Sequence, residues 1–196
     1  MDANYTSNSI NKATFDFHIT TADFDIKKAY DSIKLFRDMA TAAGKAKGII
    51  SLDYSIKGKL DGNMRPIYPS LEGVGILSVK NVQVKGFKLL DAVSKKTGKD
   101  SIANPDISKV DIKSTVKNNL IKLEKFKIKM AGFRLRMQGE TSLDGKLNMK
   151  FRLGLPPLGI IGIPMIVKGT QEHPIIKMGK GGTDELKETE HQEGEN

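Results

Sequence analysis

The chain of 196 residues contains no cysteine and no tryptophan, and only 6% of its residues are aromatic. Without cysteine, the protein has no disulfide bond, no thiolate metal site and no cysteine nucleophile. The absence does not fix the cellular compartment, because proteins of oxidising compartments can also lack cysteine.

Long apolar runs are also missing. No stretch approaches the roughly 20 apolar residues that a membrane-spanning helix needs. The opening sequence MDANYTSNS has neither the basic region nor the apolar region of a signal peptide. If the protein works outside the cytoplasm, we therefore expect its targeting segment to lie outside this chain.

Basic residues dominate, but they are unevenly distributed. The formal net charge is +9, while residues 180–196 alone hold two lysines and six acids. The basic body predicts an anionic partner such as nucleic acid, a lipid headgroup surface or an acidic protein. The acidic tail is predicted to be disordered.

The sequence offers few groups for catalysis. His191 lies in the tail, and neither His18 nor His173 has an acid and a serine at a sequence spacing typical of a catalytic triad. No His-Glu-x-x-His motif, calcium loop or phosphate-binding loop is present. We therefore predict a protein that is not an enzyme and that uses no metal or cofactor.

Hydrophobic periodicity predicts an α+β fold in which strands dominate. Residues 25–43 have apolar side chains at helical spacing, with Asp23 or Asp25 as the cap. A shorter helix is expected over residues 87–97, ended by Gly98. The remaining alternation and the short turns predict a curved, largely antiparallel sheet of about six to nine strands, with both helices packed on it.

The composition and the hydrophobic periodicity divide the chain into three parts. They are a flexible leader (1–12), one domain (13–179) and the acidic tail (180–196). The clearest strand signal is the alternation of residues 125–130, which changes phase at Ala131-Gly132 and so predicts a bulge or a corner.

The hairpin around Asp144-Gly145 has two registers that keep apolar residues opposite apolar residues. One puts the glycine at the left-handed position of the loop but sets Arg136 opposite Arg152. The other sets Glu140 opposite Lys150. Each of these effects is worth up to about 1 kcal/mol, so the sequence does not decide between the two registers.

The basic strand Lys125-Phe-Lys-Ile-Lys-Met raises the alternative of a nucleic-acid-binding module. Its charges alternate with apolar groups, so Phe126, Phe133 and Phe151 lie on the face opposite the charges. Nucleic-acid platforms instead carry aromatics on the charged face, where bases stack. No nucleic-acid partner is therefore expected.

Residues 154–167 are apolar but contain Pro156, Pro157 and Pro164. Because proline lacks a backbone donor, an inner strand is not expected there. The segment is predicted to cover the open end of the sheet or to form an exposed apolar patch, which would mark an interaction site.

Four segments together resemble the C-terminal region of AsmA-like proteins. They are GKLDGNMRP (58–66), PSLEGVG (69–75), FRLRMQG (133–139) and FRLGLPP (151–157). The Phe24-Asp25-Ile26 start of the first helix is similar too. The resemblance covers about residues 13–179 and depends on structural glycines, prolines and strand patterns.

The resemblance implies a periplasmic part of a protein of Gram-negative bacteria, tethered to the inner membrane by an N-terminal segment absent from this chain. It also implies a role in outer-membrane biogenesis and a likeness to bridge-like lipid transfer proteins, whose curved sheets carry acyl chains. The implied partners are phospholipid or another envelope lipid, and outer-membrane or envelope proteins. A protein-binding scaffold for envelope assembly is the alternative function.

The candidate lipid-binding residues are apolar side chains of the later strands and of the proline-rich segment. They are Phe126, Ile128, Met130, Phe133, Leu135, Met137, Met149, Phe151, Leu158, Ile160 and Ile161. For the strand residues, ordinary core packing is the alternative role. Each methylene of a lipid chain buried there would contribute roughly 0.8 kcal/mol.

Overall fold

The computed structural model describes residues 2–7, 13–130, 132–156, 159–179, 183 and 186–187. The strands are β1 (Asp2–Ser7), β2 (Ala13–Asp25), β3 (Ala46–Leu60), β4 (Glu72–Val84), β5 (Asp106–Lys117), β6 (Leu120–Met130), β7 (Phe133–Ser142), β8 (Lys146–Gly154), β9 (Gly162–Thr170) and β10 (Pro174–Met178). The helices are α1 (Ile26–Ser32), α2 (Lys34–Met39) and α3 (Lys88–Thr97), with 3₁₀ turns η1 (Thr41–Lys45), η2 (Tyr68–Ser70) and η3 (Asp100–Ile102).

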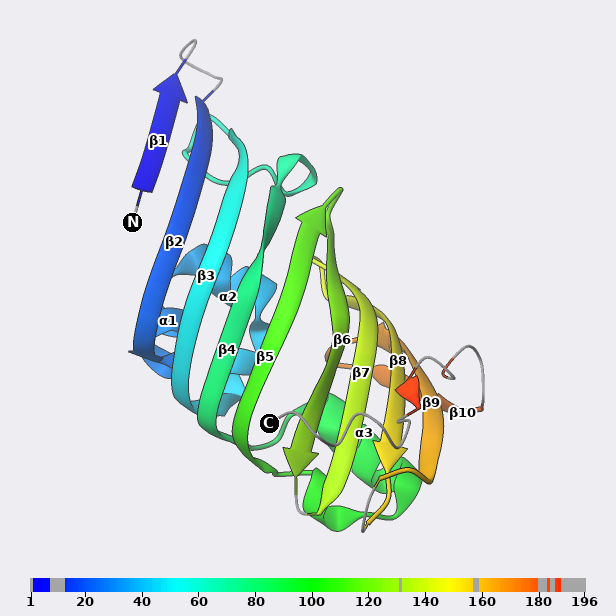
Figure 1. Ribbon diagram of the computed structural model, residues 1–196. Coiled ribbons are helices and arrows are strands. Elements are labelled where there is room, and N and C mark those ends of the chain that lie inside the picture. Colours follow the sequence, from blue (N-terminus) through cyan, green and yellow to red (C-terminus); the bar gives the residue numbers. More distant parts are fainter. Residues whose placement is uncertain are drawn as a thin grey trace.

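One open antiparallel sheet carries the whole fold. Its spatial order follows the chain from β1 to β10, and every neighbouring pair is antiparallel. Figure 1 shows the sheet curving, with all three helices on one side of it. The predicted β-dominated α+β fold with a curved antiparallel sheet is therefore confirmed. Among the described residues, no helix has both the length and the apolar character needed to cross a membrane.

The two sides of the sheet differ in chemistry. The side that carries the helices, here called the apolar face, holds residues such as Ile56 and Leu135, while the charged face holds Lys57 and Arg136. Strand residues alternate between these faces because their side chains point to opposite sides with a period of two. The faces therefore follow directly from the alternation in the sequence.

The first predicted helix is broken. Residue Ile33 adopts an extended conformation, with φ −112° and ψ 101°, so α1 ends before it and α2 begins after it. Arg37 donates from Nη1 to the carbonyls of Tyr30 (3.3 Å) and Asp31 (3.4 Å) near the end of α1. The single helix expected over residues 25–43 is therefore wrong: side-chain donation satisfies carbonyls that a continuous helix would have used.

The structure confirms a predicted cap at the start of the first helix and the predicted glycine at the end of the second. Asp25, and not Asp23, caps α1 by accepting the backbone N–H of Lys28 at 2.9 Å. Gly98 ends α3 in the left-handed conformation, with φ 66°. The second predicted helix is thus confirmed as α3. The first helix was expected to be the longer of the two, but α3 is the longest helix in the described residues.

Strand β1 was not predicted. Residues 2–7 pair with β2 from Asp2 opposite His18 to Ser7 opposite Ala13, so this part of the predicted leader forms an edge strand. Polar residues can form such a strand because the ladder uses backbone groups only. The rest of the leader lies outside the described residues.

Strand β9 contradicts the prediction that residues 154–167 hold no inner strand, because it lies between β8 and β10. Pro164 pairs with Arg152 of β8, and its carbonyl accepts the N–H of Gly179 (3.1 Å), just past the end of β10. The N and C=O of a strand residue point to the same side. The missing N–H of Pro164 therefore faces the place where β10 ends, and no inner ladder bond is lost.

Two turns settle questions that the sequence left open. Met130 pairs with Phe133, and Gly132 has φ 81°, so the phase change comes from a tight hairpin turn and not from a bulge or a corner. In the next hairpin, Gly145 takes φ 85° and Arg136 pairs with Arg152. The observed register is therefore the one that suits the left-handed glycine, and not the one that would pair Glu140 with Lys150.

The end of the chain is attached to the body at two described residues. Thr183 and Leu186 are 1% and 0% exposed, and the N–H of Leu186 donates to the carbonyl of Thr183 at 3.0 Å. Burial of a leucine side chain contributes about 1.5–3 kcal/mol, which favours this attachment. The other residues of the predicted disordered tail (180–196), apart from Lys187, lie outside the described residues.

A side-chain cluster links α2 to η2. The Nζ of Lys34 lies 2.6 Å from the carboxylate of Asp38 and 3.3 Å from the hydroxyl of Tyr68, which also donates to that carboxylate. Partial burial raises the pKa of Asp38, but the bonds from Lys34 and Tyr68 outweigh it and hold the pKa below its usual value. Ionised Asp38 therefore stabilises the folded state.

We predict that Asp38→Asn lowers the free energy of unfolding at neutral pH by about 1 kcal/mol, because hydrogen bonds to an ionised group are lost. A depressed folded pKa gives stability that is present above the unfolded pKa and is lost as pH falls through the folded pKa. The deficit of the variant should therefore shrink below about pH 4. Urea denaturation at a series of pH values measures it.

Asp31→Asn is the matched control, since Asp31 forms a similar pair with Lys27 at 2.7 Å on α1 but is 55% exposed. Solvent screens this exposed pair, so it should contribute less to stability than the cluster around Asp38 does. A deficit for Asp38→Asn that equals the control, or that does not vary with pH, would contradict the stabilising role of the cluster.

Candidate functional site on the apolar face

Two clusters of buried apolar residues occupy the apolar face. The larger cluster joins α1, α3 and strands β3 to β9, and includes Leu90 and Val93 of α3. The smaller cluster lies toward the other end of the strands and includes Phe15, Ile56 and Leu71. The buried core on this face of the sheet therefore consists of two clusters, and α2 contacts both, through Phe36 and Leu35.

Most of the predicted lipid-binding residues belong to the larger cluster. Those buried in it are Phe126, Ile128, Met130, Leu135, Met137, Met149 and Phe151, and Phe133 is half-buried against it. Leu158 lies outside the described residues. Ile160 and Ile161 are 40% and 77% exposed. The structure therefore gathers the strand members beneath α3 as core and leaves the two loop isoleucines at the surface.

A different set of apolar residues stays partly open. Leu52 of β3 pairs with Leu77 of β4, which pairs with Ile112 of β5, so the three side chains form a row across neighbouring strands. Each is only half-buried, although each lies on the apolar face. This row was not predicted, because nothing in the local sequence pattern distinguishes it from covered core.

The row marks the seam between the two clusters. Leu77 and Ile112 pack against the larger cluster and Leu52 against the smaller one, while Leu123 of β6 touches both. Direct neighbours on adjacent strands lie about 5 Å apart, so the row provides about 10 Å of continuous apolar surface. This surface is the best candidate on the apolar face for an apolar ligand.

A buried polar pair borders the seam. The hydroxyl of Tyr54 lies 3.1 Å from that of Ser114, and both residues are buried on the apolar face. Burial raises the pKa of Tyr54, so the ring stays neutral at physiological pH. Gly75 lies opposite Tyr54, and a Cβ there would sit 2.4 Å from the ring, so only glycine leaves room for it. The pair therefore fixes the Tyr54 ring as a rigid wall beside the row.

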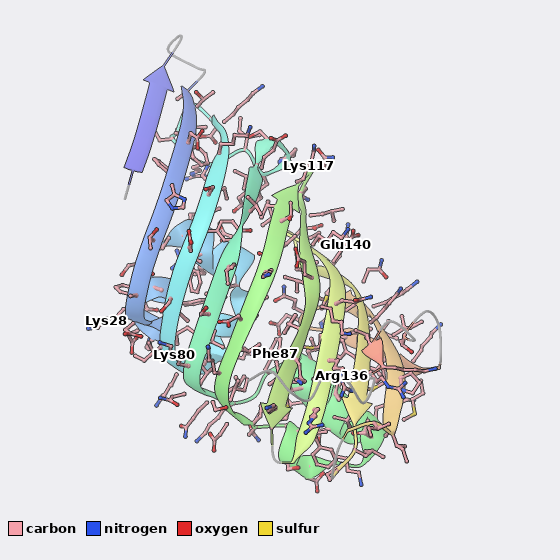
Figure 2. The ribbon with its side chains drawn as sticks, in the orientation of Figure 1. Lys28, Lys80, Phe87, Lys117, Arg136 and Glu140 are labelled. Atoms are coloured by element: carbon pink, nitrogen blue, oxygen red, sulfur yellow. The ribbon has the colours of Figure 1, made fainter. Side chains whose placement is uncertain are left out.

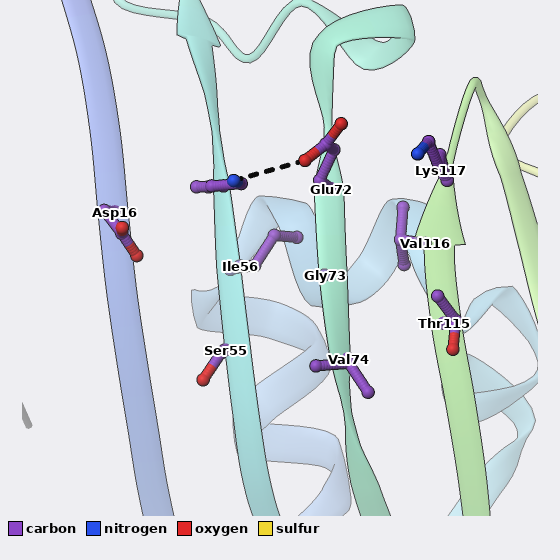
Figure 3. A pocket seen from close by; sticks show the side chains of 10 residues that line it. Asp16, Ser55, Ile56, Glu72, Gly73, Val74, Thr115, Val116 and Lys117 are labelled. Carbon is purple, nitrogen blue, oxygen red and sulfur yellow. Dashed lines mark ion pairs between the residues drawn. The ribbon is translucent and has the colours of Figure 1, made fainter.

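The charged face also has shallow depressions. One of about 400 Å³ lies over β2 to β5 and is lined by Asp16, Ser55 and Val74 among others (Figure 3). An ion pair between Lys57 and Glu72, at 3.2 Å, crosses it. With charges of both signs on an open surface, this depression selects for no particular ligand.

Strand pairing creates a cluster around His18 that sequence spacing did not reveal. His18 lies opposite Ser55, with Nδ1 2.9 Å from the serine Oγ, and its Nε2 is 3.4 Å from an oxygen of Asp53. The His18 and Asp53 side chains are 49% and 66% exposed. The ladder on both sides of β3 occupies its backbone N–H groups, so none is available to stabilise an oxyanion at Ser55. The arrangement is typical of a surface hydrogen-bond network.

Among the residues that the structure describes, no group of three or more His, Asp or Glu side chains is placed to hold a metal ion. In comparisons with known proteins, no family model, no curated protein and no solved structure matches this chain. The support for the candidate site is therefore the geometry of the seam.

The burial of the predicted residues gives a direct test. Phe151 is 0% exposed, so Phe151→Ala should lower the free energy of unfolding by about 3–5 kcal/mol. Ile161 is 77% exposed, so Ile161→Asp should change it by less than about 0.5 kcal/mol. Chemical denaturation of both variants measures the difference. Unfolding of the Ile161 variant would show that this loop belongs to the core.

Proposed function

We propose that this protein is a non-enzymatic lipid-binding module that holds an acyl chain on its apolar face, along the seam between the two clusters. The observation that carries the proposal is the half-buried row of Leu52, Leu77 and Ile112. Apolar side chains that are left partly open between covering helices are the feature expected of a surface that an apolar ligand completes.

The energetics suit a flexible hydrocarbon. Each buried methylene contributes roughly 0.8 kcal/mol, so four methylenes on the row would contribute about 3 kcal/mol before ordering costs. The same-face neighbours of the row along β3 and β5 are uncharged, because strand alternation sends Asp53 and Asp111 to the other side. Binding along the seam would therefore select for length and apolarity of the chain.

The resemblance to AsmA-like proteins extends this proposal to the cell envelope. In that setting the protein would act in the periplasm, tethered to the inner membrane, and would hold phospholipid or another envelope lipid during outer-membrane biogenesis. The support is the shared pattern of glycines, prolines and strands described above.

A protein-binding scaffold is the second candidate, and one observation favours it. Strand β10 is an edge of the sheet, and its Ile175 and Met178 are 58% and 49% exposed. An edge strand with exposed apolar side chains is a template for pairing with a partner strand. An envelope protein could add to the sheet there without occupying the seam.

Substitution of the row tests the lipid proposal. In the full chain, the double variant Leu77→Asn, Ile112→Asn should weaken binding of a fluorescent fatty acid by at least about tenfold, which corresponds to about 1.4 kcal/mol. Native mass spectrometry of the purified protein should show co-purifying phospholipid that the double variant loses.

Val74→Asn is the matched control, since Val74 lies on the same strand as Leu77 but is 60% exposed on the charged face. It should leave fatty-acid binding unchanged. Circular dichroism establishes that all variants are folded. Equal binding by the wild type and the double variant would remove the seam as the lipid site and favour the scaffold.

A further inference from the structure

The antiparallel sheet separates the connections between its strands into two sets. Because neighbouring strands alternate in direction, the connections from β2 to β3, β4 to β5, β6 to β7 and β8 to β9 all lie at one end of the strands. This end is called the helix end here, because α1, α2 and α3 belong to the first two of these connections. Figure 2 shows Lys28 toward the helix end and Lys117 at the opposite end of the strands.

Positive charge is concentrated in the connections of the helix end. Residues 26–45 and 85–105 contain ten basic and four acidic residues, which gives a formal charge of +6. The described connections at the opposite end contain one basic and three acidic residues, a formal charge of −2; they are residues 61–71, 118–119, 143–145 and 171–173. The connections therefore give the two ends of the strands opposite charge, and the helix end is the one that attracts anions.

Most lysines in the two basic connections have no acidic partner. Two of them pair with aspartates one turn further along their own helices, at 2.7 and 2.6 Å. The carbonyl of Lys45 accepts the N–H of Lys85 at 3.1 Å, so strand pairing brings two of the others together. In the part of the chain that the structure describes, seven exposed lysines of these connections form no ion pair: Lys28, Lys45, Lys85, Lys88, Lys95, Lys96 and Lys99.

The helix end also exposes apolar side chains. The connection from β8 to β9 contains no charged residue, and its Ile160 and Ile161 are 40% and 77% exposed. Helix α3, which carries three of the unpaired lysines, contacts β10, the neighbour of β9. Figure 1 shows α3 toward the same end of these later strands. One end of the molecule therefore combines unpaired lysines with exposed isoleucines.

We propose that the helix end docks on the surface of an anionic phospholipid bilayer, with its lysines at the headgroups and Ile160 and Ile161 in the interfacial layer. Each lysine near an anionic membrane strengthens binding, and apolar side chains that enter the interface add to it. A bilayer fits this surface better than a nucleic acid does, because a phosphate backbone offers no apolar layer to the isoleucines. Docking in this way stands the strands on the membrane, with their opposite end pointing away from it.

This proposal concerns one end of the strands and not the seam, so it does not rest on the proposed lipid site. Its test compares two variants of the full chain that have the same net charge. The end variant is Lys45→Gln, Lys85→Gln, Lys88→Gln, Lys99→Gln. The matched control replaces four exposed lysines of the strands: Lys59→Gln, Lys113→Gln, Lys117→Gln, Lys168→Gln.

The first measurement is sedimentation with vesicles of equimolar phosphatidylglycerol and phosphatidylcholine at low salt. The end variant should bind at least about tenfold more weakly than the control, because only it removes the lysines that face the headgroups. Equal affinities of the two variants would overturn the proposal, since net charge alone would then explain the binding. Fatty-acid binding of the same variants reports on the seam, so the failure of one proposal is distinguishable from the failure of the other.

The second measurement tests the isoleucines at physiological salt, where the attraction of the lysines is screened. The variant Ile160→Asn, Ile161→Asn should bind the same vesicles at least about threefold more weakly than its matched control, because apolar burial in the interface is lost. The control, Leu120→Asn, Ile175→Asn, changes two exposed apolar residues at the opposite end. Circular dichroism establishes that the variants are folded. Equal vesicle binding by these two variants, or tighter binding of the wild type to random duplex DNA than to the vesicles, would overturn the bilayer as the partner.

Discussion

Alternation of side chains along the strands is the constraint on which the rest of this structure depends. It divides one sheet into an apolar face that the helices must cover and a charged face that they leave free. The helices are short, and the buried apolar residues form two clusters with a half-buried seam at Leu52, Leu77 and Ile112. The open row is thus a consequence of a wide sheet with too little helix to close it.

The parts of the fold that sequence predicts are those with local signals. The Asp25 cap, the Gly98 helix end and the alternation of β6 to β8 all lie within short windows of sequence. Strands β9 and β10 escaped prediction because their pairing is decided by what lies beside them. Pro164 is compatible with an inner strand only because β10 stops next to it, and no local pattern reports where a neighbour ends.

The candidate site shows the same limit. Phe151 and Leu77 both belong to alternating strands and both face the helices, but one is fully buried and the other half-buried. The difference comes from the position of α3, which packs on the later strands. The cluster around His18 likewise exists only because β2 and β3 pair in one register. Strand pairing and helix placement depend on residues that are far apart in the sequence, so local periodicity does not predict them.

The pairing of Arg136 with Arg152 follows from backbone sterics. Both registers of the β7–β8 hairpin keep the apolar side chains together, so packing alone does not choose between them. Gly145 takes a left-handed conformation in the observed loop, and at Gly139 a Cβ would sit 2.5 Å from the carbonyl oxygen of Asn148. In this register each glycine occupies the place where another residue would be strained. Two like charges that face each other on neighbouring strands destabilise a sheet by up to about 1 kcal/mol. The conformational requirements of the two glycines together can outweigh this cost and impose the pairing of Arg136 with Arg152.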